Sequence, residues 1–177
     1  ETDDSVLRQT SARLPWLLIG MLGGIGNSMI LGNFDTTFAA HPEMALYIPL
    51  IGGTGGNVGT QSSALVVQGL ANSSLDANNT WKQILKESVV ALINATIISM
   101  LVYIYNFVRF GPTATVSYSV SLSLFAVVMF ASIFGTLVPM TLEKLKIDPA
   151  IATGPFISIT NDIIGMMLYM GITVLLS

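Results

Sequence analysis

The sequence contains no cysteine and a single histidine among its 177 residues. Without cysteine, the chain can form neither a disulfide framework nor a thiolate metal site. One histidine, His41, makes a histidine-rich metal site within one chain implausible, because such sites combine several imidazoles. Only seven residues are Lys or Arg and the net charge is -3, so nucleic acid is not expected as a partner.

Charged residues are also scarce. They make up 10% of the chain, whereas a soluble domain usually carries about 25%. Apolar residues make up 52%, and the mean hydropathy is +0.71. This composition predicts an integral membrane protein whose surroundings are the lipid bilayer.

Five apolar stretches are each long enough to cross a bilayer, which takes about 20 residues. We expect an all-α fold with a short interfacial lead-in helix or tail over residues 1–13 and a five-helix transmembrane domain over residues 14–177. The helices are expected at about 14–33, 44–70, 88–108, 117–142 and 149–177. An amphipathic stretch, 81–87, leads into the third helix, Asp148 is placed as the N-cap of the fifth, and Gly154-Pro155 is expected to kink it.

The basic residues fall on one side of this topology. One side carries Arg8, Arg13, Lys82, Lys86, Lys144 and Lys146, and the other carries Arg109 alone. The positive-inside rule therefore predicts a cytoplasmic N-terminus and an external C-terminus.

The second stretch contains an unusual run from Pro49 to Ser63. Five glycines lie between Gly52 and Gly59, although glycine is a poor helix former. The run also carries Asn57, Thr60 and Gln61, which are costly against lipid. Such a run is expected where other backbone or a water-filled path lies against it. It predicts the wall of a site or pore, and tight helix packing is the alternative reading of the glycines.

Nine of the ten acidic residues lie near helix ends, in loops or in the tail, and Asp162 is the exception. Counting from Pro149 places it about 20 Å along the last helix, in mid-bilayer and at the depth of Asn57. A carboxylate there costs several kcal/mol unless it meets a cation, a proton or water. We interpret it as a cation site, with Ser158 on the same helix face. A protonated Asp162 that bonds a neighbouring helix is the alternative.

Oxygen ligands suit hard divalent cations, but one carboxylate is a weak site for them. A two-fold dimer would bring two copies of Asp162 to one axis. Magnesium loses its waters reluctantly, so a wide glycine-lined pore with two facing aspartates fits a hydrated Mg²⁺ ion. In the external loop, Asp35 and Glu43 could form an outer mouth that concentrates cations, or simply a solvated loop.

Two motifs carry a family resemblance. The run Gly55-Gly56-Asn57-Val58-Gly59-Thr60-Gln61-Ser62 resembles the GGN-x-G-x-Q signature in the second span of the MgtE magnesium channels and their solute-carrier relatives. The run Asp148-Pro149-Ala150, the pair Gly154-Pro155 and residues 162–169 resemble that family's last span. The resemblance covers nearly the whole chain, from about Pro15 onward.

The resemblance implies a homodimer of five-helix subunits in a bacterial inner membrane, with a pore between the second and fifth spans. It implies a magnesium site at Asp162, with Asn57 and, more weakly, Ser158. The residues expected to line the pore are Gly55, Gly56, Gly59, Thr60, Gln61 and Asn161. Members of the family usually carry a cytosolic N-terminal domain and a CBS pair that close the pore. Residues 1–177 contain neither, so any gate in this sequence is expected in residues 1–13 or in the spans.

Other functions remain open. A secondary transporter coupled to sodium or protons also uses broken helices at mid-membrane, and a purely structural membrane subunit is a further alternative. An enzyme is not expected, because an aspartyl intramembrane protease needs two carboxylates at depth and a serine type needs an intramembrane base. The sequence leaves open the choice among Mg²⁺, Mn²⁺, Co²⁺, Ni²⁺ and Ca²⁺.

Overall fold

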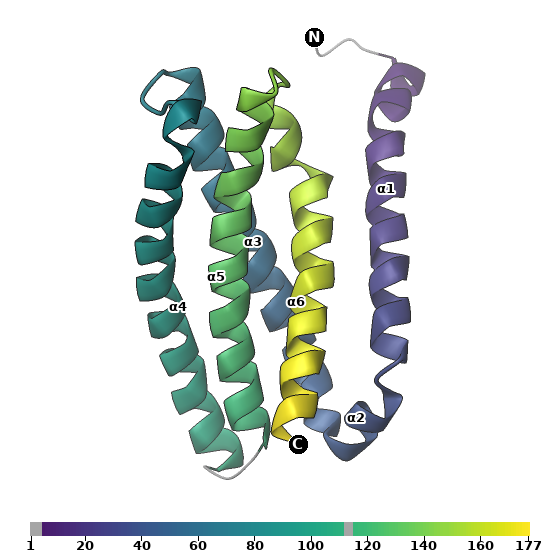
Figure 1. The fold of residues 1–177 in the computed structure, drawn as a ribbon. Coiled ribbons are helices and arrows are strands. Elements are labelled where there is room, and N and C mark those ends of the chain that lie inside the picture. Colours follow the sequence, from purple (N-terminus) through teal and green to yellow (C-terminus); the bar gives the residue numbers. More distant parts are fainter. Residues whose placement is uncertain (1–4, 112–114) are drawn as a thin grey trace.

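The computed structural model describes residues 5–111 and 115–177, except the side chains of residues 152 and 153, and these residues are helical with no strand (Figure 1). The α-helices are α1 (Val6–Gly32), α2 (Asp35–Ala40), α3 (Ile48–Ala71), α4 (Thr80–Phe110), α5 (Thr115–Lys144) and α6 (Pro155–Leu176). Short 3-10 segments are η1 (Pro42–Tyr47), η2 (Ala77–Asn79) and η3 (Pro149–Thr153). The predicted all-α fold is confirmed.

The five long helices run up and down in turn, so α1 begins at one end of the bundle and α6 finishes at the other (Figure 1). Helix α5 lies in the middle and packs against α3, α4 and α6. Helix α1 stands at the edge and packs against α6. None of the residues of α1 is buried.

Two predicted boundaries are wrong. Of the lead-in predicted over residues 1–13, residues 1–4 lie outside the described residues. The rest is not a separate element, because α1 begins at Val6, is capped by Ser5 and continues through Pro15. Neighbouring groups can compensate the backbone bond that a proline removes within such a helix. Residues 81–87 likewise form the first turns of α4. Polar side chains at the head-group level change the surroundings of a helix without ending it.

The last predicted helix is divided in two. Asp148 acts as the predicted cap, since its carboxylate accepts a hydrogen bond from the Ala150 N–H at 3.0 Å. It caps the 3-10 segment η3, which ends at Gly154 with φ -102° and ψ -146°. Pro155 then starts α6. The kink predicted at Gly154-Pro155 is confirmed, and it is a complete break in the helix.

The apolar core lies where α3, α5 and α6 meet and includes Ile51, Leu124, Val127, Met166 and Tyr169. The Tyr169 hydroxyl donates a hydrogen bond to the Met44 carbonyl at 3.0 Å, which attaches η1 to α6. This contact fixes the start of α3, the helix that carries the glycine run.

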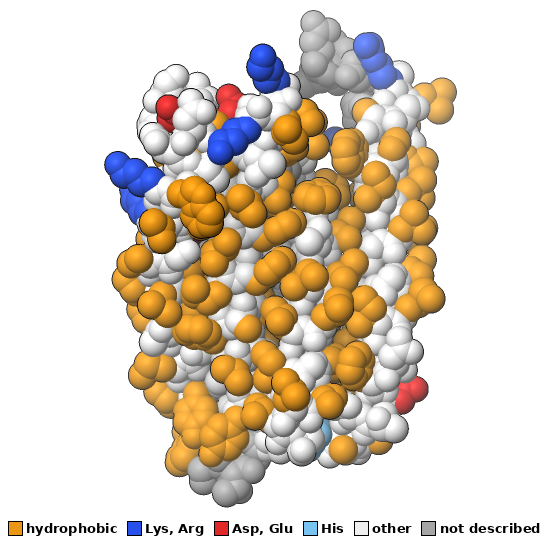
Figure 2. Space-filling view, viewed as in Figure 1, with side chains coloured by type: hydrophobic (Ala, Val, Ile, Leu, Met, Phe, Trp, Pro, Cys, Tyr) orange, Lys and Arg blue, Asp and Glu red, His pale blue; other side chains and the backbone are white. Residues whose placement is uncertain are grey.

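Four of the described helices are long and apolar enough to cross a membrane: α1, α4 together with η2, α5 and α6. Apolar side chains cover the middle of the face drawn in Figure 2, and Lys and Arg side chains gather at the end where α1 begins. Helix α3 has 24 residues, which gives it a length of about 36 Å. Helix α3 is therefore long enough to cross a membrane, but its glycines and polar side chains make it less apolar than these four helices.

Candidate functional site

A cleft with a volume of about 710 Å³ runs along α3 between α1 and α6. Helix α1 contributes one residue to its wall, and α6 contributes three. The lining residues are Asn27, Ile48, Gly52, Gly53, Gly56, Asn57, Thr60, Gln61, Ala64, Ser158, Asp162 and Met166. Six predicted site residues come together here, namely Gly56, Asn57, Thr60, Gln61, Ser158 and Asp162.

The cleft face of α3 follows the helical period. Gly53, Asn57, Thr60 and Ala64 are spaced by three or four residues and therefore lie on one face. All four are exposed in the chain, and so is Gln61. The polar side chains of the run thus point into an open cleft along the middle of the bundle.

Asp162 lies half-buried on the α6 side of this cleft. A Cβ atom added to Gly52 would lie 3.6 Å from its Oδ1 atom, so the α3 backbone passes close to the carboxylate without touching it. The sequence predicted that Asp162 lies at the same depth in the membrane as Asn57, and it did not single out Gly52. Gly52 lies five residues, or more than one helical turn, before Asn57, so Asp162 has a close neighbour on α3 besides the residue expected at its depth.

Asn27 of α1 was not predicted as a site residue. Its Oδ1 atom is buried and has no hydrogen-bond partner among the described residues. Gly23 lies one turn earlier on the same face, and a Cβ atom there would come within 2.7 Å of the Ile159 side chain. Glycine at this position lets α1 approach α6 closely enough for Asn27 to reach the cleft. The signal in the sequence was an amide among apolar and small residues of the first span.

Three residues expected to line the pore lie elsewhere. Gly55 and Gly59 are buried on the opposite face of α3. A Cβ atom on Gly55 would lie 2.8 Å from the Val127 Cγ1 atom, and one on Gly59 would collide with the Asn161 amide. Asn161 is only 1% exposed. These two glycines allow close helix packing, whereas Gly52, Gly53 and Gly56 shape the cleft.

The predicted outer mouth is not part of the cleft. Asp35 is exposed at the start of α2, and Glu43 lies in η1. Neither residue lines the cavity. In the described part of the chain, no three His, Cys, Asp or Glu side chains come together as ligands for a metal ion. A single chain therefore offers one carboxylate, amide and hydroxyl groups, and space for water.

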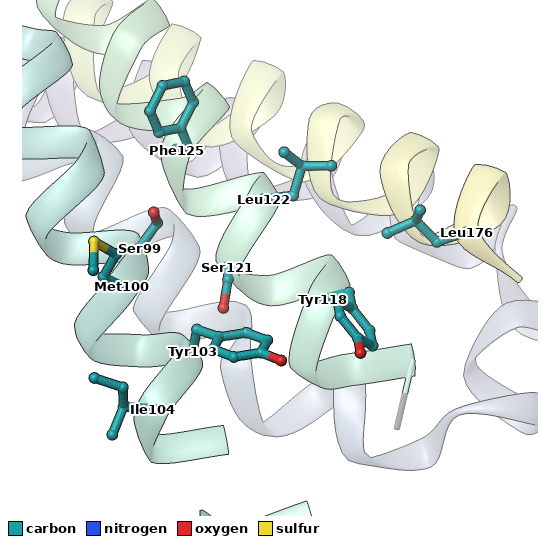
Figure 3. Close-up of a pocket in the computed structure, with 9 residues that line it drawn as sticks. All are labelled: Ser99, Met100, Tyr103, Ile104, Tyr118, Ser121, Leu122, Phe125 and Leu176. Atoms are coloured by element: carbon teal, nitrogen blue, oxygen red, sulfur yellow. The ribbon is translucent and has the colours of Figure 1, made fainter. Parts of the chain in front are cut away.

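A second hollow, a groove of about 610 Å³, lies between α4 and α5 with Leu176 at its edge (Figure 3). Its wall includes the Tyr103 and Tyr118 rings, whose centroids are 5.8 Å apart. The groove carries no charged residue. It therefore lacks the charge that an ion site requires, and the cleft at Asp162 remains the candidate.

Comparison with known proteins identifies the family of the chain. A protein family described as "MgtE: Divalent cation transporter" matches residues 48–172, which run from the start of α3 into α6. Over 160 residues, the chain is 33% identical to the magnesium transporter MgtE of Bacillus subtilis, covering 90% of this chain and 35% of that protein. Against the Thermus thermophilus magnesium transporter MgtE, identity is 33% over 93% of this chain and 36% of that protein.

The magnesium transporter MgtE of Enterococcus faecalis is 30% identical over 97% of this chain and 38% of its own length. The chain thus spans little more than a third of the length of these curated relatives. The relatives are bacterial, and together with the apolar helices they confirm the predicted location as an integral protein of the inner membrane. The matched region and the motifs within α3 and α6 show that the chain belongs to the MgtE family of divalent cation transporters.

Proposed function

We propose that the protein carries magnesium ions across the membrane through a pore built around the Asp162 cleft. The observation that carries this proposal is the exposed polar face of α3 in an otherwise apolar bundle. Asn57, Thr60 and Gln61 would be costly against lipid, and a water-filled path removes that cost. The three curated relatives compared above are magnesium transporters, which favours Mg²⁺ as the ion.

We infer that a second copy of the chain closes the open side of the cleft. In a two-fold dimer the same patch meets itself, so two copies of Asp162 would face one path and supply two negative charges. Helices α3 and α6 would be the second and fifth of five spans and would line this path. Because Mg²⁺ keeps several waters, two carboxylates with nearby amide and hydroxyl groups suit it as a hydrated ion.

Asn57, Ser158 and Asn27 would then bind the waters of the ion. An amide oxygen or a hydroxyl can accept a hydrogen bond from a coordinated water, and the buried Oδ1 atom of Asn27 has this capacity free. The basic residues at the end where α1 begins favour a cytoplasmic N-terminus. On the other side, Asp35 and Glu43 would lie near the external entrance.

The test compares Asp162→Asn with wild type in liposomes that contain a magnesium-sensitive dye. The substitution keeps the shape of the side chain and removes its charge. Because the variant loses a contact between the ion and a charged group, we expect its uptake to be roughly tenfold to a hundredfold slower. Asp76→Asn is the matched control, because Asp76 lies at a surface turn where it caps the Asn78 N–H, a bond that asparagine can also make.

Slow uptake by Asp162→Asn, with normal dimers and a normal Asp76→Asn control, supports the proposal. Normal uptake by Asp162→Asn contradicts it. Uptake that requires a sodium or proton gradient would instead identify a coupled transporter.

A further inference from the structure

Glu87 is a second acidic side chain within the helical bundle. Sequence reasoning placed it just before the third span, but it is the eighth residue of α4, about 10 Å from the start of that helix. It is partly buried. An ionisable residue at such a position is costly and calls for a specific partner.

The partner is Ser62 on the back of α3. The Ser62 hydroxyl donates a hydrogen bond of 2.8 Å to the Glu87 Oε1 atom. Ser62 is buried, whereas Thr60 and Gln61 directly before it are exposed in the cleft. The hydrogen bond therefore holds α3 from the side opposite to its polar face.

This bond bridges two helices that otherwise hardly touch. Helix α3 packs mainly against α5 and α6, and α5 separates it from α4. The α5 contact is close, since a Cβ atom on Gly135 would lie 3.2 Å from the Ser62 Cβ atom. The long Glu87 side chain passes to Ser62 at this junction. Packing against α5 and α6 holds α3 in place, and the bond to Glu87 adds a directional contact on a third side.

We propose that Glu87 is a positioning residue that fixes the rotation of α3 and so the presentation of Asn57, Thr60 and Gln61 to the cleft. Its effect on ion passage rests on the proposed transport function. Its effect on α3 does not. The carboxylate acts by accepting a hydrogen bond, so an acceptor of the same length in its place preserves the arrangement.

The absence of cysteine provides a clean background for a test that needs no ion. Thr60→Cys places a thiol on the cleft face of α3, and its rate of reaction with a small water-soluble methanethiosulfonate reagent reports the orientation of the helix. We expect Glu87→Ala to change this rate about tenfold, because the free energy of one hydrogen bond to a charged group corresponds to about that factor. Glu87→Gln keeps an acceptor oxygen and should leave the rate unchanged.

Two further variants separate orientation from folding. Ser62→Ala removes the donor but keeps the Cβ atom that packs near Gly135, and it should change the Thr60→Cys rate as Glu87→Ala does. The double variant Ser62→Ala/Glu87→Ala should change it no further. A thiol at exposed Thr36, in α2 at the other end of the bundle, is the matched control and should react at one rate in every background.

An unchanged rate in Ser62→Ala overturns the proposal. The proposal is also overturned if Glu87→Gln changes the labelling rate as much as Glu87→Ala does. In that case the charge of Glu87, and not its hydrogen bond, would matter. In magnesium uptake, Glu87→Gln should restore what Glu87→Ala loses. If the wild type carries no magnesium, the proposed function fails while the labelling result still decides the role of Glu87.

Discussion

Replacing Gly135 with alanine tests the packing that places α3. The added Cβ atom would lie 2.7 Å from the Gly59 carbonyl oxygen and 3.2 Å from the Ser62 Cβ atom. Ordinary contacts begin at 3.4 Å, so the two helices would have to separate by 3.4 - 2.7, or about 0.7 Å, at this point. The obstacle is backbone and cannot rotate away. Overpacking of this kind costs about 1–3 kcal/mol.

Gly171→Ala provides the matched control, because an added Cβ atom there meets nothing within 4 Å. Both variants gain up to about 1 kcal/mol of helix propensity, so the difference between them isolates the clash. Denaturant titration in detergent micelles should show Gly135→Ala to be less stable than Gly171→Ala by about 1–3 kcal/mol. Equal stability, or a more stable Gly135→Ala variant, would refute the close contact between α3 and α5.

Three further predictions concern the cleft and its support. A Cβ atom on Gly52 would lie 3.6 Å from the Asp162 Oδ1 atom and 3.9 Å from the Met166 Cε atom, so Gly52→Ala fits without strain. It should be at least as stable as the wild type in denaturant titration but slow magnesium uptake, and normal uptake would argue against passage at Asp162. Asn27→Leu replaces the amide with an apolar side chain of similar size and so removes the acceptor oxygen. It should also slow uptake in liposomes, and dimers should remain intact on size-exclusion chromatography. Uptake equal to wild type would exclude Asn27 from the path. Tyr169→Phe leaves the buried Met44 carbonyl without its 3.0 Å hydrogen bond and should lower the free energy of unfolding by about 1–3 kcal/mol. An unchanged denaturation midpoint would contradict this.

The long helices could be predicted because each apolar run is long enough to cross a bilayer. The break at Gly154-Pro155 followed from the residues themselves, since glycine and proline both disfavour a helix interior. The continuity of α1 through Pro15 could not be predicted, because it depends on how neighbouring groups compensate a missing backbone bond. The boundary before α4 was wrong because polar residues do not end a helix at the head-group level, and Glu87 was therefore placed in the lead-in before the third span.

In the cleft, the sequence indicated α3 and α6 and six of the lining residues, but it missed α1 and did not separate the two faces of α3. Gly55, Gly56 and Gly59 were all expected to line the pore, although Gly55 and Gly59 lie on the packed side. Counting at the helical period from Asn57 would have excluded both. That Asn161 is buried, and that Asn27 reaches the cleft, depends on which helices pack against α6. A single sequence does not contain that information.

The most direct measurement is a high-resolution map of the protein in the membrane with Mg²⁺ present. The proposed pore predicts a dimer in which two copies of Asp162 face each other, with one ion between them. The ion would be held through its waters, roughly 4 Å from the carboxylate oxygens. A map in which the two clefts face lipid on opposite sides, or in which the ion in the membrane lies away from Asp162, would contradict the proposed path.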